Sequence, residues 1–217
     1  FLDDQVARID LLIGMRRRQS HLVEETRLSA LRTAFEGGKT VALRRLLREA
    51  VVGIVVQPAA LYTDDAEGIP ALRGTDVGEG TISSENLVRL TPEGHAMHPR
   101  SRLVAGDVLV VRTGDAGASA VVPTWADGWN CIDLVIARVD PALTMPEFVS
   151  TAINAARHAA SVAAAASGSI QQHFGVNALL DLEVPALYLG AQRAVVEGDS
   201  LGRRHASEAR AAMNASV

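Results

Sequence analysis

The sequence predicts an α+β protein in which a long N-terminal coiled-coil-type helix precedes a β-rich domain with a C-terminal helix. Three observations lead to this fold class. Apolar residues recur at helical spacing near the N-terminus, short β-prone runs bounded by turn residues fill the middle of the chain, and an alanine-rich helical stretch follows them. Apolar residues make up 48% of the 217 residues, which is enough for a buried core.

The first domain, residues 1–38, is expected to be one long helix. Apolar side chains recur there in steps of three and four, over residues 2–13 and again over residues 22–35, and Gly37 and Gly38 mark the end of the helix. A helix of this size would be about 50 Å long. Because that length exceeds the width of most small domains, we expect the helix to pair with a partner helix.

The second domain, residues 39–187, is expected to be rich in β-strands after a short helical connection over residues 41–48. Its strands are expected in six runs bounded by Gly, Pro, Asp or Asn: VVGIVVQ, GIPALRGTDV, ENLVRL, GDVLVVRTG, ASAVVP and NCIDLVIARV. A helix over residues 145–168 follows, and LLDLEVPAL then returns to extended structure. For the tail, residues 188–217, a degenerate helix and a disordered segment both remain open.

Charge is unevenly distributed along the chain, whose net charge is −4. The first 48 residues carry ten Arg or Lys against six Asp or Glu, whereas residues 49–148 carry six Arg against fourteen Asp or Glu. The negative net charge argues against indiscriminate binding to nucleic acid. Any contact with DNA must therefore come from individual arginines.

The single cysteine and the absence of long apolar runs in the sequence indicate the cellular environment of the protein. Cys131 cannot form a disulfide within the chain or build a zinc site by itself, and we expect it to be a buried structural thiol. The sequence holds no run of eighteen apolar residues. We therefore expect a cytoplasmic protein that has no membrane partner.

No group of residues in the sequence points to catalysis. The glycines of RTGDAGAS (112–119) lack the Lys-Ser ending of a phosphate-binding loop, and β sequence follows them, which favours a hairpin turn that presents Arg112 and Thr113. His95 and His98 lack the further ligands of a metal site, so a solvated loop is the favoured interpretation. Without a Gly-x-Ser-x-Gly motif or a distinct Ser–His pair, the sequence predicts a protein that is not an enzyme and carries no metal or cofactor.

A cluster of neutral polar residues follows the helix expected at 145–168. Within SGSIQQHFGVNALLDLEVP, the residues Ser169, Gln171, Gln172 and His173 lie close together in the sequence. Gln can bond bidentately to adenine, and Ser can contact bases or phosphates. The alternative is a polar loop that satisfies buried backbone groups at a helix end, and both interpretations stay open.

In their order along the chain, these stretches resemble the specificity subunit (S subunit) of type I restriction-modification systems. FLDDQVARIDLLIGM…RRQSHLVEE is similar to the conserved spacer helix of that family, GIPALRGTDV…GTI to the first strands of its target recognition domain, and LVAGDVLVVRTGDAGASAVV to the central hairpin of that domain. SGSIQQHFGVNALLDLEVP resembles the closing Gly-Ser-x-Gln segment and the strand that follows it.

The resemblance implies a DNA-binding subunit that performs no chemistry. In that family each target recognition domain reads one half of a split double-stranded DNA site, and helices of the conserved regions pair and hold two such domains apart. The methyltransferase (modification) subunits methylate adenine, and a separate restriction subunit serves as motor and endonuclease. Residues 39–187 would then be the target recognition domain, and the hairpin at 108–123 would be framework with its tip near DNA.

The sequence also departs from the family pattern. A full specificity subunit has two recognition domains, whereas this chain carries one behind one spacer helix, so it resembles a half, a C-terminal fragment, or a half-subunit that forms a homodimer through the N-terminal helix. After LEVP the chain keeps Gln192 and Arg193 but lacks the usual prolines. This loss motivates an alternative function, a protein-interaction module that docks the methyltransferase through the long helix without sequence-specific DNA reading.

Nine residues are the predicted DNA contacts. Arg reads guanine and Gln reads adenine in the major groove, which selects candidates in the expected turns for base or phosphate contact. These candidates are Arg73, Thr75, Arg112, Thr113, Ser169, Gln171 and Gln172. Arg100 and Arg102 are expected to contact phosphate groups.

Overall fold

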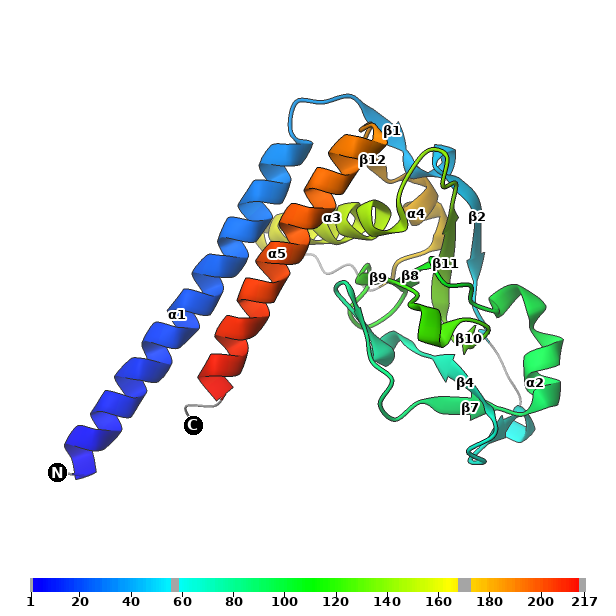
Figure 1. Cartoon of the computed structure of the whole chain (residues 1–217), viewed down its shortest axis with the longest axis horizontal. Helices are drawn as coiled ribbons and strands as arrows, with labels where there is room; N and C mark the ends of the chain where they lie inside the picture. The colour runs from blue at the N-terminus through cyan, green and yellow to red at the C-terminus, as the bar shows by residue number, and fades with distance from the viewer. Residues whose placement is uncertain (1, 56–58, 168–172, 215–217) are drawn as a thin grey trace. The chain divides into compact units, whose positions relative to one another are not determined.

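The computed structural model describes residues 2–55, 59–167 and 173–214 and divides into two compact units (Figure 1). The helical unit comprises helix α1 (Leu2–Phe35) and, from Arg193 onward, helix α5 (Leu189–Asn214). The β-rich unit comprises residues 38–192. The predicted fold class, with a long N-terminal helix, a β-rich middle and a C-terminal helix, is thus confirmed.

In the helical unit, α1 and α5 run side by side in opposite directions (Figure 1). Leu31 and Ala206 are buried, and so are the charged side chains of Arg27 and Asp199. A side chain at Gly202 would come within 2.7 Å of Cγ of Arg27, so this glycine inside α5 accommodates the arginine. A degenerate helix and a disordered segment were both left open for the tail, and the structure has a helix there as far as Asn214.

The β-rich unit is built on a four-stranded antiparallel sheet with the order β2-β11-β8-β9. Its strands are β2 (Leu47–Val52), β11 (Leu134–Val139), β8 (Val108–Val111) and β9 (Ser119–Val121). In the register of this sheet, Val135 of β11 lies opposite Val52 of β2 and Val110 of β8. All four residues of β8 are buried, which explains why this strand is an uninterrupted apolar run in the sequence.

A second four-stranded sheet has the order β10-β4-β7-β3, in which β10 and β4 are parallel. Its strands are β10 (Asn130–Cys131), β4 (Ile69–Leu72), β7 (Val88–Leu90) and β3 (Tyr62–Thr63). Two short ribbons complete the unit, β1 (Thr40–Ala42) with β12 (Glu183–Pro185) and β5 (Val77–Gly78) with β6 (Thr81–Ile82). Because β1 and β12 are the first and last strands of the chain, their pairing closes the unit.

Helix α3 (Pro146–Ser167) packs on β8 and β9 of the main sheet. Its residues Phe148, Val149 and Ile153 are buried in this packing. The side-chain amide of Asn154 accepts a hydrogen bond from the backbone N–H of Ser119 at 3.0 Å and donates one to its carbonyl oxygen at 2.9 Å. Since β9 is an edge strand of the sheet, Asn154 and the N–H of Gly80, which donates to the same carbonyl at 2.8 Å, together take the place of a neighbouring strand at this residue.

Three expectations about local structure are wrong. Residues 41–48, expected to be helical, contain the end of β1, a 3-10 turn and the start of β2, because β2 pairs along β11. The segment LLDLEVPAL begins inside helix α4 (Val176–Asp181), and β12 is its extended part. The segment of His95 is not a loop but helix α2 (Pro92–Met97), which begins where the hydroxyl of Thr91 accepts a hydrogen bond from the N–H of Gly94 at 3.1 Å.

Candidate nucleic-acid interface

Several strands of the β-rich unit end at one place, which we call the strand-end rim and define as residues 53–54, 73–75, 112–113, 132–133 and 173–174. Three backbone hydrogen bonds join these segments: Gly53 N–H to the carbonyl of Leu134 at 2.8 Å, Asp133 N–H to Ile54 at 2.9 Å, and Ile132 N–H to Leu72 at 2.8 Å. The N–H of Phe174 donates to the carbonyl of Arg112 at 2.8 Å. The rim therefore brings together residues that are far apart in the sequence.

Arg112 and Thr113, two of the predicted DNA contacts, share one carboxylate on the rim. The guanidinium of Arg112 forms an ion pair with Asp133, and the hydroxyl of Thr113 donates to the other oxygen of Asp133 at 3.4 Å. Nη2 of Arg112 lies 3.3 Å from Nε2 of His173. Because a guanidinium can only donate, this contact requires Nε2 of His173 to be unprotonated. The side chain of Arg112 is 16% exposed and that of Asp133 is 39% exposed, so Asp133 holds the arginine at the surface of the rim.

Arg73 and Thr75 share a second carboxylate, that of the buried Asp76. Asp76 accepts hydrogen bonds from the backbone N–H of Arg73 at 2.7 Å, from Nε of Arg73 at 3.2 Å, and from the hydroxyl of Thr75 at 3.3 Å. Nη2 of Arg73 also donates to the carbonyl of Asn86 at 2.8 Å. A side chain at Gly74 would meet that of Val111 at 3.4 Å. The turn that carries Arg73 thus lies against Val111, the last residue of β8, which directly precedes Arg112.

The tip of the β8–β9 hairpin is fixed to helix α3. Arg157 of α3 donates to the carboxylate of Asp115 at 2.6 Å and to that of Glu79 at 2.9 Å, and Nε2 of His158 lies 2.6 Å from Glu79. Gly117, with a φ of +86°, lies where a side chain would contact Arg157 at 3.4 Å. The glycine-containing stretch therefore forms the predicted hairpin turn, and its anchoring holds Arg112 and Thr113 at the base of the turn in one position.

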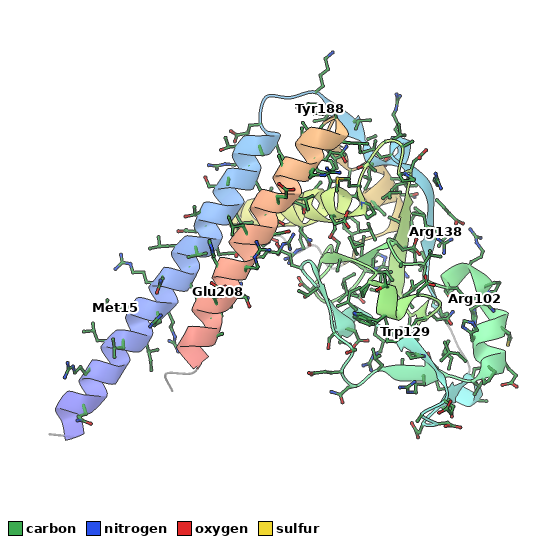
Figure 2. The ribbon with its side chains drawn as sticks, viewed as in Figure 1. Met15, Arg102, Trp129, Arg138, Tyr188 and Glu208 are labelled. Atoms are coloured by element: carbon green, nitrogen blue, oxygen red, sulfur yellow. The ribbon has the colours of Figure 1, made fainter. Side chains whose placement is uncertain are left out.

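Arg138, near the end of β11 opposite to Asp133, contacts the backbone of both Arg100 and Arg102. Figure 2 labels Arg102 and Arg138. Arg138 donates to the carboxylate of Glu49 at 2.5 Å and to the carbonyl oxygen of Arg102 at 2.9 Å, and Arg100 reaches Glu49 at 3.4 Å. The hydrogen bond from Arg138 holds the pKa of Glu49 below its ordinary value. The structure thus separates the six predicted contacts that it describes, because these two arginines lie away from the rim.

Three of the predicted contacts, Ser169, Gln171 and Gln172, lie outside the described residues. The next residues in the chain, His173 and Phe174, are described, and both contact Arg112. His173, the fourth member of the polar cluster recognised in the sequence, therefore belongs to the strand-end rim.

His95 and Cys131 have structural roles in the β-rich unit. Nδ1 of His95 lies 2.5 Å from Oδ1 of the fully buried Asn130, whose amide nitrogen donates to the hydroxyl of Ser101 at 2.7 Å. His95 thus supports a buried polar network instead of lying in a solvated loop. Cys131 is buried as expected, and burial raises the pKa of its thiol, which disfavours the reactive thiolate.

The residues that position the rim were not recognised in the sequence. Asp133 precedes a β-prone run and Asp76 follows a Gly-Thr pair, positions at which Asp commonly marks a turn. Asp133 has a φ of +51°, in the left-handed region that Asn and Asp enter more readily than other residues with side chains. The turn chemistry was visible, but the arginine that each carboxylate binds was not.

Comparisons with known proteins place the fold. No protein-family model and no curated protein sequence matches the chain. A solved chain from a study of complex assembly and conformational transition of the type I R-M system has a TM-score of 0.73 and 17% sequence identity, covering 99% of this chain and 53% of that one. The HsdS subunit from Thermoanaerobacter tengcongensis has a TM-score of 0.65 and 16% identity, covering 97% and 50%. The type I restriction-modification S subunit from M. genitalium has a TM-score of 0.54 and 10% identity, covering 99% and 54%.

This chain spans about half the length of each of these structures. It therefore has the fold of one half of a type I specificity subunit, and the resemblance inferred from the sequence is confirmed at the level of the fold. In the part of the chain that the structure describes, none of the helices is both long and apolar enough to cross a membrane.

Proposed function

We propose that this chain is the sequence-specific DNA recognition subunit, or the recognition half of one, of a type I restriction-modification system. It reads one half-site of double-stranded DNA and directs a partner adenine methyltransferase and a restriction motor subunit, which perform the chemistry. This role places the chain in the cytoplasm, with the DNA that it reads. The similarity of fold to specificity subunits supports the proposal, and the strand-end rim supplies residues suited to it.

The observation that carries the proposal is the pairing of two arginines with fixed carboxylates on the rim. Asp76 orients Arg73, and Asp133 orients Arg112, while each guanidinium retains further N–H donors. Arginine donors in a fixed orientation match O6 and N7 of guanine in the major groove. Thr113 adds a hydroxyl beside Arg112 that can contact a base or a phosphate.

Charge predicts a division of labour between this chain and its partners. Residues 49–148 are acidic, so the β-rich unit alone attracts the phosphate backbone weakly. The side chain of Arg100 is 78% exposed and can contact a phosphate, as can Arg102. We expect the methyltransferase to supply most of the remaining backbone contacts.

A selection experiment tests the proposal. A complex of this chain with its cognate methyltransferase is offered a pool of random-sequence duplexes at moderate salt, and we expect enrichment of a motif of about three to five base pairs. Arg112→Ala should then weaken binding of the enriched duplex by about 5- to 150-fold and relax the preference at one position. Arg48→Ala, which removes an exposed arginine at the far end of β2 from the rim, should leave the motif unchanged. An equal loss on every sequence in the Arg112 variant would contradict base reading by this residue.

The second candidate function is a protein-interaction module that docks the methyltransferase without reading DNA. It is favoured by an apolar groove of about 740 Å³ in the helical unit, lined among others by Met15, Leu22, Val23 and Leu201. A stable complex with the methyltransferase that enriches no motif would establish this function instead. A palindromic pair of motifs at fixed spacing would indicate that two chains pair as a homodimer through the long helix.

A further inference from the structure

Asp133 has a left-handed backbone conformation that is uncommon for a residue with a side chain. It lies between β10 and β11, its φ is +51°, and its N–H donates to the carbonyl of Ile54 at 2.9 Å. Glycine has the least steric cost in this left-handed conformation. An aspartate there retains the strain of a side chain and, in addition, places a carboxylate on a surface proposed to face DNA phosphates.

The carboxylate of Asp133 binds the two residues that directly follow β8. One oxygen takes the guanidinium of Arg112 and the other takes the hydroxyl of Thr113. Arg112 has a second neighbour in His173 at 3.3 Å, so its guanidinium is held from two sides. The ion pair neutralises the charge of Arg112 while leaving N–H donors for a ligand whose acceptors lie at fixed positions.

A neutralised and oriented arginine binds phosphate groups and guanine bases with different strength. Phosphates attract any mobile cation at every sequence, whereas guanine presents O6 and N7 in one geometry. Asp133 repels phosphate and restrains Arg112, which penalises sequence-independent binding more than it penalises the matching base. Specificity is a difference of affinities, and a repulsive group that weakens the wrong complexes increases this difference.

We propose that Asp133 is a specificity-determining residue, which acts through Arg112 to reduce binding to non-matching DNA. This inference rests on the proposed DNA-reading function. The related pair of Arg73 with Asp76 provides a second carboxylate-held arginine on the same rim. Asp76 is 5% exposed and also holds its own turn, so the half-exposed Asp133 is the position where the carboxylate can be removed with less risk to folding.

The test compares Asp133→Asn with the unaltered chain, each in complex with the methyltransferase. Binding of the enriched duplex and of a scrambled duplex is measured over a series of salt concentrations. We expect Asp133→Asn to bind the scrambled duplex several-fold more tightly, to increase the salt slope by about one, and to reduce the ratio of the two affinities by about tenfold. Asp64→Asn removes the same charge from an exposed turn at the other end of β4 and should leave the ratio unchanged.

Two further measurements separate specificity from folding. Thermal unfolding should show that Asp133→Asn remains folded, and in the double variant with Arg112→Ala the removal of Asp133 should change the ratio no further, because Asp133 acts through Arg112. An unchanged ratio in Asp133→Asn, or equal weakening of both duplexes, would overturn the inference. A ratio of one for the unaltered chain would instead overturn the proposed function, and the inference with it.

Discussion

Among single residues, Arg138 connects three segments at the outer end of β11. Its guanidinium donates to the carboxylate of Glu49 on β2 at 2.5 Å and to the carbonyl oxygen of Arg102 at 2.9 Å, and it lies 3.5 Å from Asp107. The pKa values of these two carboxyl groups are shifted in opposite directions. The hydrogen bond from Arg138 lowers the pKa of Glu49, whereas burial raises the pKa of Asp107. The pH dependence of stability at this end of the sheet is therefore a balance of opposite contributions.

Substitution of Glu49 isolates one side of this balance. Because the folded-state pKa of Glu49 lies below its ordinary value of 4.5, its ion pair stabilises the protein above that pH and is lost as the pH falls through the lowered pKa. Asp107 contributes with the opposite sign, since its raised pKa makes the folded state bind a proton more tightly. We expect Glu49→Gln to flatten the decline of the free energy of unfolding between about pH 5 and pH 3, measured by urea denaturation. Glu93→Gln, at an exposed site in α2, is the control, and its free energy of unfolding should change with pH as that of the unaltered chain does. The same pH dependence in Glu49→Gln would contradict the assigned role of the Glu49–Arg138 ion pair.

Among the elements, the pairing of α1 with α5 depends on buried charges as well as on apolar side chains. Arg27 of α1 donates to Asp199 of α5 at 2.5 Å and to Glu24 at 2.6 Å, and Nε of Arg203 donates to Asp199 at 2.8 Å. The side chain of Arg27 is 3% exposed and that of Asp199 is 1% exposed. Buried charges of this kind fix the register of paired helices, because another register leaves them without partners.

Removal of one charge from this pair should cost more than removal of both. Arg27→Leu is expected to destabilise the chain by about 2 to 4 kcal/mol, since Asp199 loses a buried partner, while the double variant Arg27→Leu with Asp199→Leu should recover most of that loss. Helical circular dichroism followed through urea denaturation measures both. Arg32→Leu breaks an exposed pair with Glu36 and should change the stability by less than about 1 kcal/mol. Additive losses in the double variant would show that the pair is not coupled.

The local structure that the sequence predicted correctly depends on nearby residues. Periodicity identified α1, an alanine-rich stretch identified α3, and glycines with positive φ identified the β8–β9 hairpin. The helix expected over residues 41–48 is partly β2 because β2 pairs with β11, almost ninety residues later in the chain. Gly202 lies inside α5, where glycine is unfavourable, because Arg27 of α1 occupies the space that a side chain would fill.

In the candidate site, too, the features set by nearby residues could be predicted from the sequence, and those set by distant residues could not. Arg112 and Thr113 could be selected as candidates because a turn presents them, which is a local property. The carboxylate that holds Arg112 and Thr113, and the arginine of α3 that fixes the hairpin tip, come from segments 20 or more residues away. No local pattern specifies such a partner, so these residues could be recognised only in the folded chain.

For the whole molecule, the helical unit presents apolar side chains to solvent. Leu11, Leu12, Met15 and Leu22 of α1 are each more than half exposed. Met15, which is labelled in Figure 2, and Leu22 line the groove described above. Apolar patches of this kind on a helix pair are typical of surfaces that bind further helices. We propose this surface as the docking site for the methyltransferase.

A charged side chain introduced into the groove should therefore weaken assembly with the methyltransferase and leave the fold intact. We expect Met15→Glu to reduce capture of the methyltransferase by at least tenfold in a pull-down with the full chain, because a carboxylate in an apolar interface must be desolvated. Glu208→Gln, an exposed change on α5, is the control. Undiminished capture by Met15→Glu would place the docking surface elsewhere.

The contact between Asn154 and β9 has a consequence for the behaviour of the protein in solution. A bare strand at the edge of a sheet offers its backbone to any other extended chain, and such pairing leads to aggregation. In this molecule a helix covers that edge, and its amide side chain bonds both backbone groups of Ser119. The carbonyl of Ser119 also accepts hydrogen bonds from the N–H of Gly80 at 2.8 Å and from the hydroxyl of Ser150 at 3.0 Å. Asn154→Leu would therefore preserve the bulk of the side chain but leave the N–H of Ser119 without its partner, so concentrated samples should begin to precipitate before the helices or the remaining strands lose their structure.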